Sequence, residues 1–256
     1  LTALSNVRID VMTALVAFER VFEVLDLQPM IVDKPGAKVL SKKNLQIDFT
    51  DVAFSYPRAD EISLASLESA AKPETVESGE VLRGISFTAP AGTLTAIVGP
   101  SGAGKTTMSA LLPRLYDVTR GAITVDGEDI REFTVQSLRD SIGVVMQDAH
   151  LFHETIAENL RYAKEDATEN EMIEACKAAQ IWDLISSLPN GFETMVGERG
   201  HRLSGGEKQR LAIARLLLKA PAIVILDEAT APLASENESL VHEALKHALK
   251  GRTSIV

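Results

Sequence analysis

The sequence is poor in cysteine and in basic residues, and each shortage excludes a class of protein. The single cysteine, Cys176, cannot form an intrachain disulfide or a zinc site that needs several thiolates, and it fits a reducing compartment. Basic residues number 26 against 36 acidic ones, which gives a formal charge of −10. Phosphate backbones and anionic lipid repel such a chain unless it carries a local basic patch, so we expect no nucleic-acid partner.

Long apolar runs are also absent. The longest uncharged stretch near the start, 11–18, is far shorter than the ~18–20 apolar residues of a membrane span, and no signal peptide is visible. The 256 residues are 45% hydrophobic and 24% charged, which is typical of a folded chain with one large domain or one domain and an appendage. The first residue is Leu and not Met, which suggests a fragment of a longer protein.

The first half of the chain divides into three segments. Residues 4–27 carry apolar side chains at helical spacing, and we expect this amphipathic helix to pack on the domain that follows. Residues 45–54 alternate apolar and polar side chains and predict a strand. Residues 60–80 hold one Asp, five Glu and one Lys with no sustained period, which indicates a solvated insertion, most simply a variable loop.

From residue 81 onward, strand and helix patterns alternate. Short apolar runs predict strands at 94–98, 122–125 with an Asp126–Gly127 turn, 142–146 and 222–226, the last suited to burial on both faces of a parallel sheet. Helices are expected from about Lys105 and within 155–188, where caps are offered by Thr155, Asp166 and Thr168. The pattern predicts an α/β fold with a helical insert at about 150–215.

A glycine-rich loop lies between the predicted strand 94–98 and the helix from Lys105. It matches the motif G-x-x-x-x-G-K-[ST] with Gly99, Pro100, Ser101, Gly102, Ala103, Gly104, Lys105 and Thr106. Small residues let backbone N–H groups converge on phosphate oxygens, and the helix N-terminus adds about half a positive charge. Lys105 supplies a cation for the β- and γ-phosphates and Thr106 a hydroxyl for magnesium. The loop therefore predicts a nucleoside triphosphate site.

Two acids, Asp227 and Glu228, end the apolar run 222–226. Ligands of open α/β sheets bind at the carboxyl ends of the strands, so Asp227 is placed to hold magnesium directly or through water. Glu228 is expected to polarise a water molecule for attack on the γ-phosphate. If the glycine loop upstream were absent, it would be equally reasonable that these two acids only mark the end of a strand and have no functional role.

A second glycine pair follows at Leu203-Ser204-Gly205-Gly206-Glu207. Ser204 and Glu207 form a capping-box pattern that opens a helix through Leu218. A cap alone does not require two glycines, each of which costs about 1 kcal/mol in a helix. We therefore expect something to approach this backbone closely, and a helix N-terminus suits an anion.

These three motifs, in this order, resemble the nucleotide-binding domain of an exporter-type ABC transporter over residues 45–256. The resemblance implies a P-loop NTPase core with a mostly parallel sheet, an antiparallel β subdomain and a helical insert subdomain at about 150–215. It assigns residues 1–40 to the end of the last membrane helix and a linker, and 41–256 to the nucleotide-binding domain. The cofactors it implies are ATP and Mg²⁺.

The resemblance also assigns residues that composition does not single out. Tyr56 matches the aromatic residue that stacks on adenine, and Gln147 matches the glutamine that contacts magnesium and faces the membrane domain. Thr107 extends the phosphate loop, while 196–200 resembles the exporter stretch that senses the coupling helices. Without the family, Tyr56 and Gln147 would be interpreted as packing residues.

The family arrangement implies two partners: the transmembrane domain of the same transporter, and a second nucleotide-binding domain paired head to tail. Whether this pair is a homodimer or a heterodimer stays open. The implied location is the cytoplasmic face of the cell membrane. A further alternative is a soluble relative that acts on DNA or ribosomes. By resemblance, chromosome-type members of the family insert long coiled coils between the glycine loop and the signature, and the 99 residues from Lys105 to Ser204 leave no room for them. This alternative is therefore not favoured.

Two departures from the family pattern leave two functions open. Residues 231–234 read Ala-Pro-Leu-Ala where the family usually has Ser-Ala-Leu-Asp, and the sequence stops at Val256, short of the family's γ-phosphate-sensing histidine. The first function is an ATPase that powers substrate export through ATP-dependent dimerisation. The alternative is an ATP-gated dimerisation module with little hydrolysis.

Overall fold

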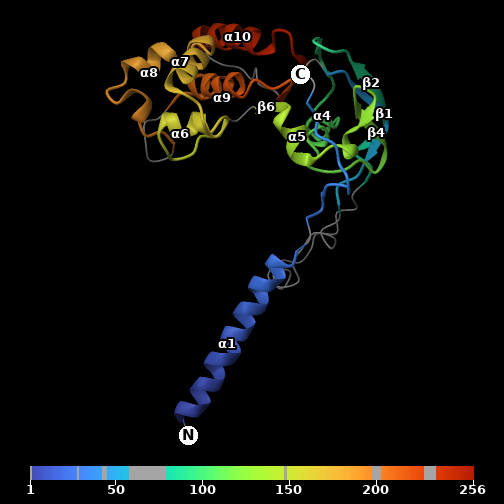
Figure 1. The fold of residues 1–256 in the computed structure, drawn as a ribbon, viewed down its shortest axis with the longest axis vertical. Helices are drawn as coiled ribbons and strands as arrows, with labels where there is room; N and C mark the ends of the chain where they lie inside the picture. Colours follow the sequence, from blue (N-terminus) through green and yellow to red (C-terminus); the bar gives the residue numbers. More distant parts are fainter. Residues whose placement is uncertain are drawn as a thin grey trace.

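The computed structural model describes residues 2–27, 29–41, 45–57, 79–146, 149–197, 203–227 and 235–256 (Figure 1). Nearly all of the expected 60–80 insertion and the whole 231–234 loop lie outside the described residues. In Figure 1 two groups of elements lie side by side, one mostly helical and one built around β-strands, and a single long helix extends away from both.

One of the two sheets is antiparallel. It contains β1 (Ile47–Phe54), β2 (Leu82–Ala89), β4 (Arg120–Val125) and β5 (Glu128–Asp129) in the order β2-β1-β4-β5. The strands expected at 45–54 and 122–125 are confirmed. Asp126 and Gly127 both have positive φ, 51° and 79°, and connect β4 to β5, which is the conformation of a tight hairpin turn.

The other sheet is parallel throughout. Its strands are β3 (Leu94–Thr95), β6 (Ile142–Met146), β7 (Ile223–Asp227) and β8 (Thr253–Ile255), in the order β3-β8-β7-β6. The strands expected at 142–146 and 222–226 are confirmed. The strand expected at 94–98 is shorter in the structure: β3 covers Leu94–Thr95, although the Ile97 N–H still donates to the Val256 carbonyl at 2.6 Å, and Val98 is 90% exposed.

Helices follow most of the strands of the parallel sheet. They are α4 (Lys105–Leu111), α5 (Val135–Asp140), α6 (Ile156–Arg161), α7 (Glu169–Ala178), α8 (Trp182–Ser187), α9 (Gly205–Lys219) and α10 (Ser235–Leu249), with 3-10 turns η1 (Ile130–Glu132) and η2 (Gly191–Glu193). Of these helices, α4 and α5 lie in the β group, and α6 to α10 form the helical group (Figure 1). Thr155 caps α6 and Thr168 caps α7, as expected. Asp166 caps none of the described helices, because α7 begins two residues later than such a cap requires.

Strand β7 separates two apolar cores. Val224 and Leu226 pack with α6–α10, whereas Ile223 and Ile225 pack with the antiparallel sheet and α4. Side chains alternate across a strand, so burial on both faces explains the continuous apolar run in the sequence. A Cβ at Gly143 on β6 would lie 2.1 Å from Leu216 Cδ1, which shows how closely α9 packs on this sheet.

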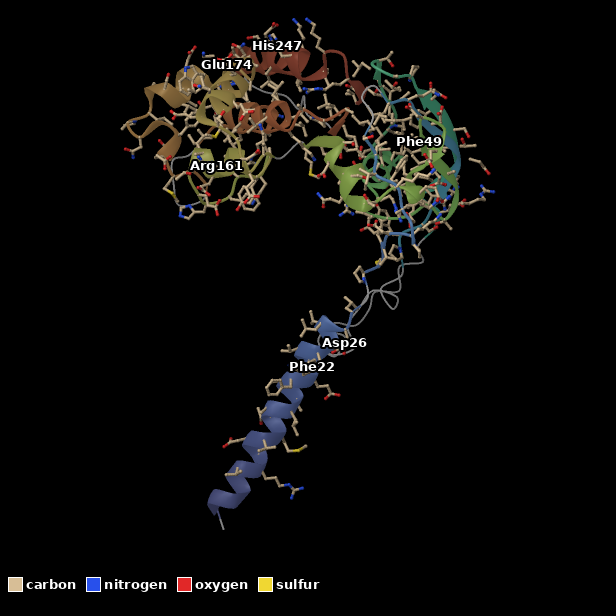
Figure 2. The ribbon with its side chains drawn as sticks, viewed as in Figure 1. Phe22, Asp26, Phe49, Arg161, Glu174 and His247 are labelled. Carbon is tan, nitrogen blue, oxygen red and sulfur yellow. The ribbon has the colours of Figure 1, made fainter. Side chains whose placement is uncertain are left out.

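The first helix, α1 (Thr2–Leu25), packs on none of the other elements that the structure describes. Phe18 is 60% exposed and Phe22 55%, and Figure 2 shows Phe22 on a helix with no other element beside it. The expectation that this apolar stripe is buried on the following domain is therefore wrong: helical spacing identifies an apolar face but not its partner. Among the described residues, no helix has the length and apolar character needed to span a bilayer.

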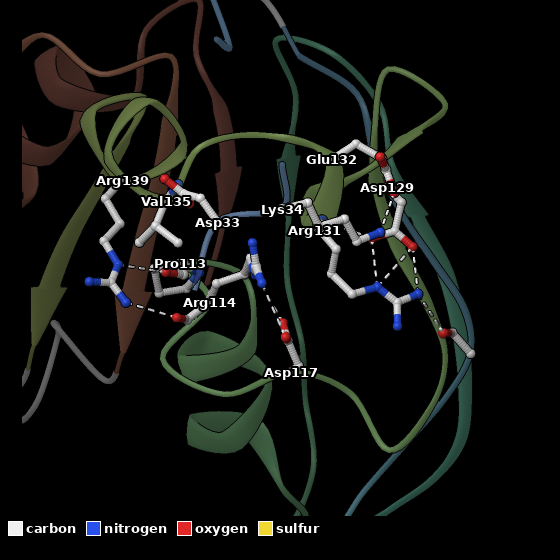
Figure 3. A network of polar contacts seen from close by, with 11 residues as sticks. Asp33, Lys34, Pro113, Arg114, Asp117, Asp129, Arg131, Glu132, Val135 and Arg139 are labelled. Atoms are coloured by element: carbon white, nitrogen blue, oxygen red, sulfur yellow. Dashed lines mark hydrogen bonds and ion pairs between the residues drawn. The ribbon is translucent and has the colours of Figure 1, made fainter. Parts of the chain in front are cut away.

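The segment after α1 is bound to the edge of the β group. The Asp33 carboxylate accepts a hydrogen bond of 2.7 Å from the Val135 N–H at the start of α5 (Figure 3). Lys34 forms an ion pair with Glu132, and the Lys38 backbone pairs with that of Phe133. An acid at a helix N-terminus is favourable, so this linker is joined to α5 by charge as well as by backbone pairing.

Candidate nucleotide-binding site

The glycine loop connects β3 to α4 and places Lys105 at the first turn of the helix. Gly104 is left-handed, with φ of 89°, and a Cβ there would lie 2.5 Å from Leu82 Cδ2, so both the turn and the packing require glycine. Among the described residues, no side chain caps this helix end. The Lys105 ammonium donates to the carbonyls of Gly99 at 3.0 Å and Pro100 at 3.1 Å. The loop thus folds around the lysine cation beside an uncapped helix N-terminus.

The carboxyl end of β7 lies against the start of α4. Thr106 donates from Oγ1 to Asp227 Oδ1 over 3.3 Å, although the two residues are 121 positions apart in the sequence. A hydroxyl and a carboxylate are oxygen ligands of the kind that Mg²⁺ accepts. The structure therefore brings together two of the three residues expected to hold magnesium.

Gln147 and Glu228 themselves lie outside the described residues. The residues before them are described: β6 and β7 pair in parallel with Met146 opposite Asp227. The two strands that lead to Gln147 and Glu228 therefore end side by side, at the same edge of the sheet as the Thr106–Asp227 contact.

Tyr56 contacts the helix that carries the loop. Its hydroxyl lies 3.0 Å from Thr107 Oγ1, and its ring packs edge-on against Phe54 and Tyr116 with centroid distances of 4.9 and 5.3 Å. The ring is still 37% exposed. Tyr56 therefore has the packing role suggested by its residue type, and its position beside Thr107 also suits a base-stacking role. Tyr116 was missed from the sequence, which contains no motif that marks it.

The C-terminal end of α4 is held by two arginines (Figure 3). Arg139 of α5 donates to the carbonyls of Pro113 at 2.9 Å and Arg114 at 2.8 Å. The buried Arg114 guanidinium pairs with Asp117 through two bonds, of 2.9 and 3.1 Å. Two-pronged arginine contacts of this kind restrict orientation, so the phosphate-loop helix is fixed at the end opposite the loop.

The second glycine pair begins α9. Ser204 and Glu207 form the expected capping box: the Ser204 N–H donates to Glu207 Oε2 at 2.6 Å and the Glu207 N–H to Ser204 Oγ at 3.4 Å. Ser204 and Gly205 are exposed, but Gly206 is buried within its own chain. The close approach expected at this backbone is therefore open from outside at Gly205, whereas Gly206 is covered by its own chain. In Figure 1, α9 lies in the helical group and α4 in the β group, so the two helix ends are in different parts of the molecule.

The one cysteine takes no part in this site. Burial raises the pKa of the Cys176 thiol to about 12, so it stays protonated and unreactive at neutral pH. Within the described part of the chain, no group of three or more His, Cys, Asp and Glu side chains forms a metal cluster.

Comparisons with known proteins agree with this geometry. A family model described as ABC transporter matches residues 82–231. ABC transporter B family member 6 of Dictyostelium discoideum is 42% identical over 96% of this chain and 36% of its own length. The ATP-dependent lipid A-core flippase of Syntrophus aciditrophicus is 42% identical over 99% of this chain and 39% of its own length.

A solved structure is similar as well. The structure of a bacterial Atm1-family ABC exporter with ATP bound superposes with a TM-score of 0.81 and 40% sequence identity, over 95% of this chain and 39% of that one. The chain therefore belongs to the ABC transporter family and is homologous to the nucleotide-binding domains of ABC exporters. It spans less than two fifths of the length of these three relatives.

Proposed function

We propose that this chain binds ATP with Mg²⁺ and hydrolyses it to power export of a substrate across a membrane. The observation that carries the proposal is the contact between Thr106 and Asp227, 3.3 Å long, beside Lys105 and the uncapped N-terminus of α4. This contact supports a triphosphate site because a phosphate-binding loop requires a magnesium partner at its first turn. The membership in the ABC transporter family supports the same function.

In this proposal the triphosphate lies along the loop, from Gly99 to Thr107. Backbone N–H groups of the loop and the Lys105 ammonium bind the phosphate oxygens, and Tyr56 stacks on the adenine ring. Thr106, Asp227 and Gln147 hold Mg²⁺, which when bound offsets charge on the phosphates. Glu228 accepts a proton from the water that attacks the γ-phosphate.

The proposed assembly pairs two such domains head to tail. Each ATP lies between the loop of one domain and Ser204, Gly205 and Gly206 of the other, so that binding closes the pair and hydrolysis reopens it. The exposed positions of Ser204 and Gly205 support this contact, whereas Gly206 is buried in its own chain. We further propose that the pair, homomeric or heteromeric, works at the cytoplasmic face of the cell membrane with the transmembrane domain of the same transporter. The extended apolar helix α1 supports such a connection.

The test is Glu228→Gln in the full-length protein. The amide cannot accept the proton, so steady-state phosphate release should fall by about 10²–10⁴-fold. ATP binding, followed with a fluorescent nucleotide, should be unchanged. The matched control is Glu243→Gln, an exposed residue of α10 that pairs with Lys246 and His247 of the same helix. A Glu228→Gln protein with the turnover of the control would exclude Glu228 as the base.

A second candidate function is an ATP-gated dimerisation module with little turnover. The observation that favours it is the Ala-Pro-Leu-Ala sequence at 231–234, where Pro232 restricts the backbone and no acid is present to signal across the dimer. Light scattering with ATP and phosphate release, measured on the same sample, separate the two functions. Dimerisation without phosphate release would support this second function.

A further inference from the structure

Tyr56 is anchored at its hydroxyl and is still partly exposed. The hydroxyl lies 3.0 Å from Thr107 Oγ1, and Thr107 is only 5% exposed. Buried hydroxyl groups need a hydrogen-bond partner, so this pair fixes the tip of the tyrosine ring on α4. With 37% of the residue exposed, part of its ring surface remains available to a ligand.

Two other aromatic rings restrict the tilt of the Tyr56 ring. Tyr116 packs against it with a centroid distance of 5.3 Å and an angle of 88° between the ring planes, and Phe54 packs at 4.9 Å and 79°. Phe54 and Tyr116 also contact each other at 5.6 Å. Edge-to-face contacts of this kind are a favourable geometry for aromatic pairs. The three rings therefore form one cluster, of which Tyr56 is the exposed member.

Backbone contacts hold the segment that carries Tyr116 beside the segment that carries Tyr56. The Thr119 N–H donates to the Ala53 carbonyl at 2.9 Å, and the Ser55 N–H donates to Thr119 Oγ1 at 3.2 Å. The contact between the two tyrosine rings is therefore supported by hydrogen bonds on the strand side of both residues.

The turn that contains Tyr116 is closed by the residues on either side of it. Arg114 has a positive φ of 50°, and its guanidinium forms two hydrogen bonds with the carboxylate of Asp117 (Figure 3). Arg139 of α5 binds the Arg114 carbonyl at 2.8 Å. A two-pronged arginine contact restricts orientation, so Tyr116 meets Tyr56 from a restrained turn.

We propose that Tyr116 is a positioning residue: together with Thr107 it holds the Tyr56 ring in the orientation that stacks on the base of the nucleotide. The inference rests on the proposed function, because it explains the orientation of Tyr56 by residues that are not themselves proposed to contact the base. A side chain that is already oriented loses little conformational freedom when a ligand binds, and this preorganisation raises affinity. The support concerns the base, so binding of the phosphates should not depend on it.

The first variant is Tyr116→Leu in the full-length protein. Leucine keeps an apolar side chain beside Phe54 but removes the ring that meets Tyr56. The affinity for ATP with Mg²⁺ should fall about fivefold, which is the size expected for the loss of one aromatic pair. The affinity for inorganic tripolyphosphate with Mg²⁺ should be unchanged, because this ligand has no base. Titration calorimetry measures both affinities.

Two control variants separate this role from a general loss of stability. Tyr162→Leu is the matched control: Tyr162 lies at the end of α6, where its ring packs on Phe152 at 4.4 Å, and this variant should keep both affinities. Tyr116→Phe keeps the ring and should have the ATP affinity of the wild-type protein.

Tyr56→Phe tests the other half of the support. It keeps the stacking ring and loses the hydroxyl that pairs with Thr107, whose own hydroxyl can then bond to a carbonyl of its helix. The affinity for ATP should fall about threefold, the size of one hydrogen bond, with no change for tripolyphosphate. This variant carries the test if Tyr116→Leu does not fold, and an ATP affinity equal to that of the wild-type protein would then overturn the positioning role.

The outcomes distinguish this proposal from the proposed function. If the wild-type protein binds ATP but releases no phosphate, the proposed hydrolysis fails and the positioning role stands. Equal ATP affinities of Tyr116→Leu and Tyr162→Leu would overturn the positioning role and leave the proposed function intact. An equal loss of affinity for ATP and tripolyphosphate in Tyr116→Leu would also overturn it, because Tyr116 would then only stabilise the fold around the glycine loop. A wild-type protein that binds neither ligand would overturn both proposals.

Discussion

The N-termini of α4 and α9 both lie in glycine-containing motifs, yet they are stabilised differently. Helix α9 is capped by its own side chains, Ser204 and Glu207, in a reciprocal box. Helix α4 begins at a left-handed Gly104 without a side-chain cap, and Lys105 turns back onto the loop carbonyls. Unpaired N–H groups at a helix start are satisfied by caps, water or ligands. The two helix starts therefore differ in how their N–H groups are satisfied: α9 is capped by its own side chains, whereas no described side chain caps α4.

The largest expected effect tests the cation at the α4 end. Lys105→Ala removes the ammonium that is proposed to bind the phosphates, and ATP affinity should fall about 100-fold, or about 2.8 kcal/mol. Titration with a fluorescent nucleotide measures this change. The control is Lys208→Ala in the first turn of α9, which should leave the affinity of a single domain unchanged. Equal affinities of the two variants would remove the distinction between the helix ends.

The second prediction compares two glycines of the loop. A Cβ at Gly104 would meet Leu82 Cδ2 at 2.5 Å, whereas one at Gly102 has no atom within 4 Å, and both residues have positive φ. Backbone strain is common to both variants, but only Gly104→Ala adds overpacking. Its free energy of unfolding should fall by about 2 kcal/mol more than that of Gly102→Ala. Urea denaturation measures both values, and equal losses would contradict the packing argument.

The third prediction concerns the capping boxes. Ser204→Ala and Thr168→Ala each remove the serine or threonine of a box, at α9 and α7, and each should cost about 1 kcal/mol of unfolding free energy. Only Ser204→Ala should also weaken ATP-dependent dimerisation, measured by light scattering. If Thr168→Ala weakens dimerisation equally, the α9 cap has no role beyond stability.

The smallest effect is a pH dependence at the α7 box. Hydrogen bonds from the Lys164 ammonium and then from the Thr168 backbone lower the pKa of Glu171 from 4.5 to about 2. A lowered pKa in the folded state means that the stabilisation is complete above pH 4.5 and is lost as the pH falls toward 2. Glu171→Gln should remove this part of the pH dependence of the urea midpoint. An identical pH profile for the variant and the wild type would contradict it.

The sequence predicted most of the parallel sheet and both motif helices because the relevant signals are local. Runs such as 142–146 and 222–226 need no tertiary information, and the cap at Thr168 is read from residues that contact one another within one turn. The length of β3 could not be predicted, since Val98 is as apolar as residues of the buried strands and yet is 90% exposed in the structure.

The sequence could not predict which side chains pair with each other when they come from distant segments of the chain. Nothing local to Arg215 indicates that it binds the His150 carbonyl 65 positions earlier. The same limit applies to α1: its apolar face is visible at helical spacing, but whether that face is covered depends on what lies beside it. Asp166 was expected as a helix cap from its residue type alone. Because α7 begins at Glu169, its cap is Thr168 and not Asp166.

The sequence by itself determined the chemistry: a lysine and hydroxyl after glycines, a carboxylate after a buried strand, and a reciprocal box before a helix. These features depend on residue type and on short spacings along the chain, both of which the sequence contains before the chain folds. Tertiary structure alone decided that Thr106 meets Asp227 and that Gly205 faces outward while Gly206 does not. Contacts between segments more than 100 residues apart depend on how strands and helices pack, and packing is a property of the whole chain.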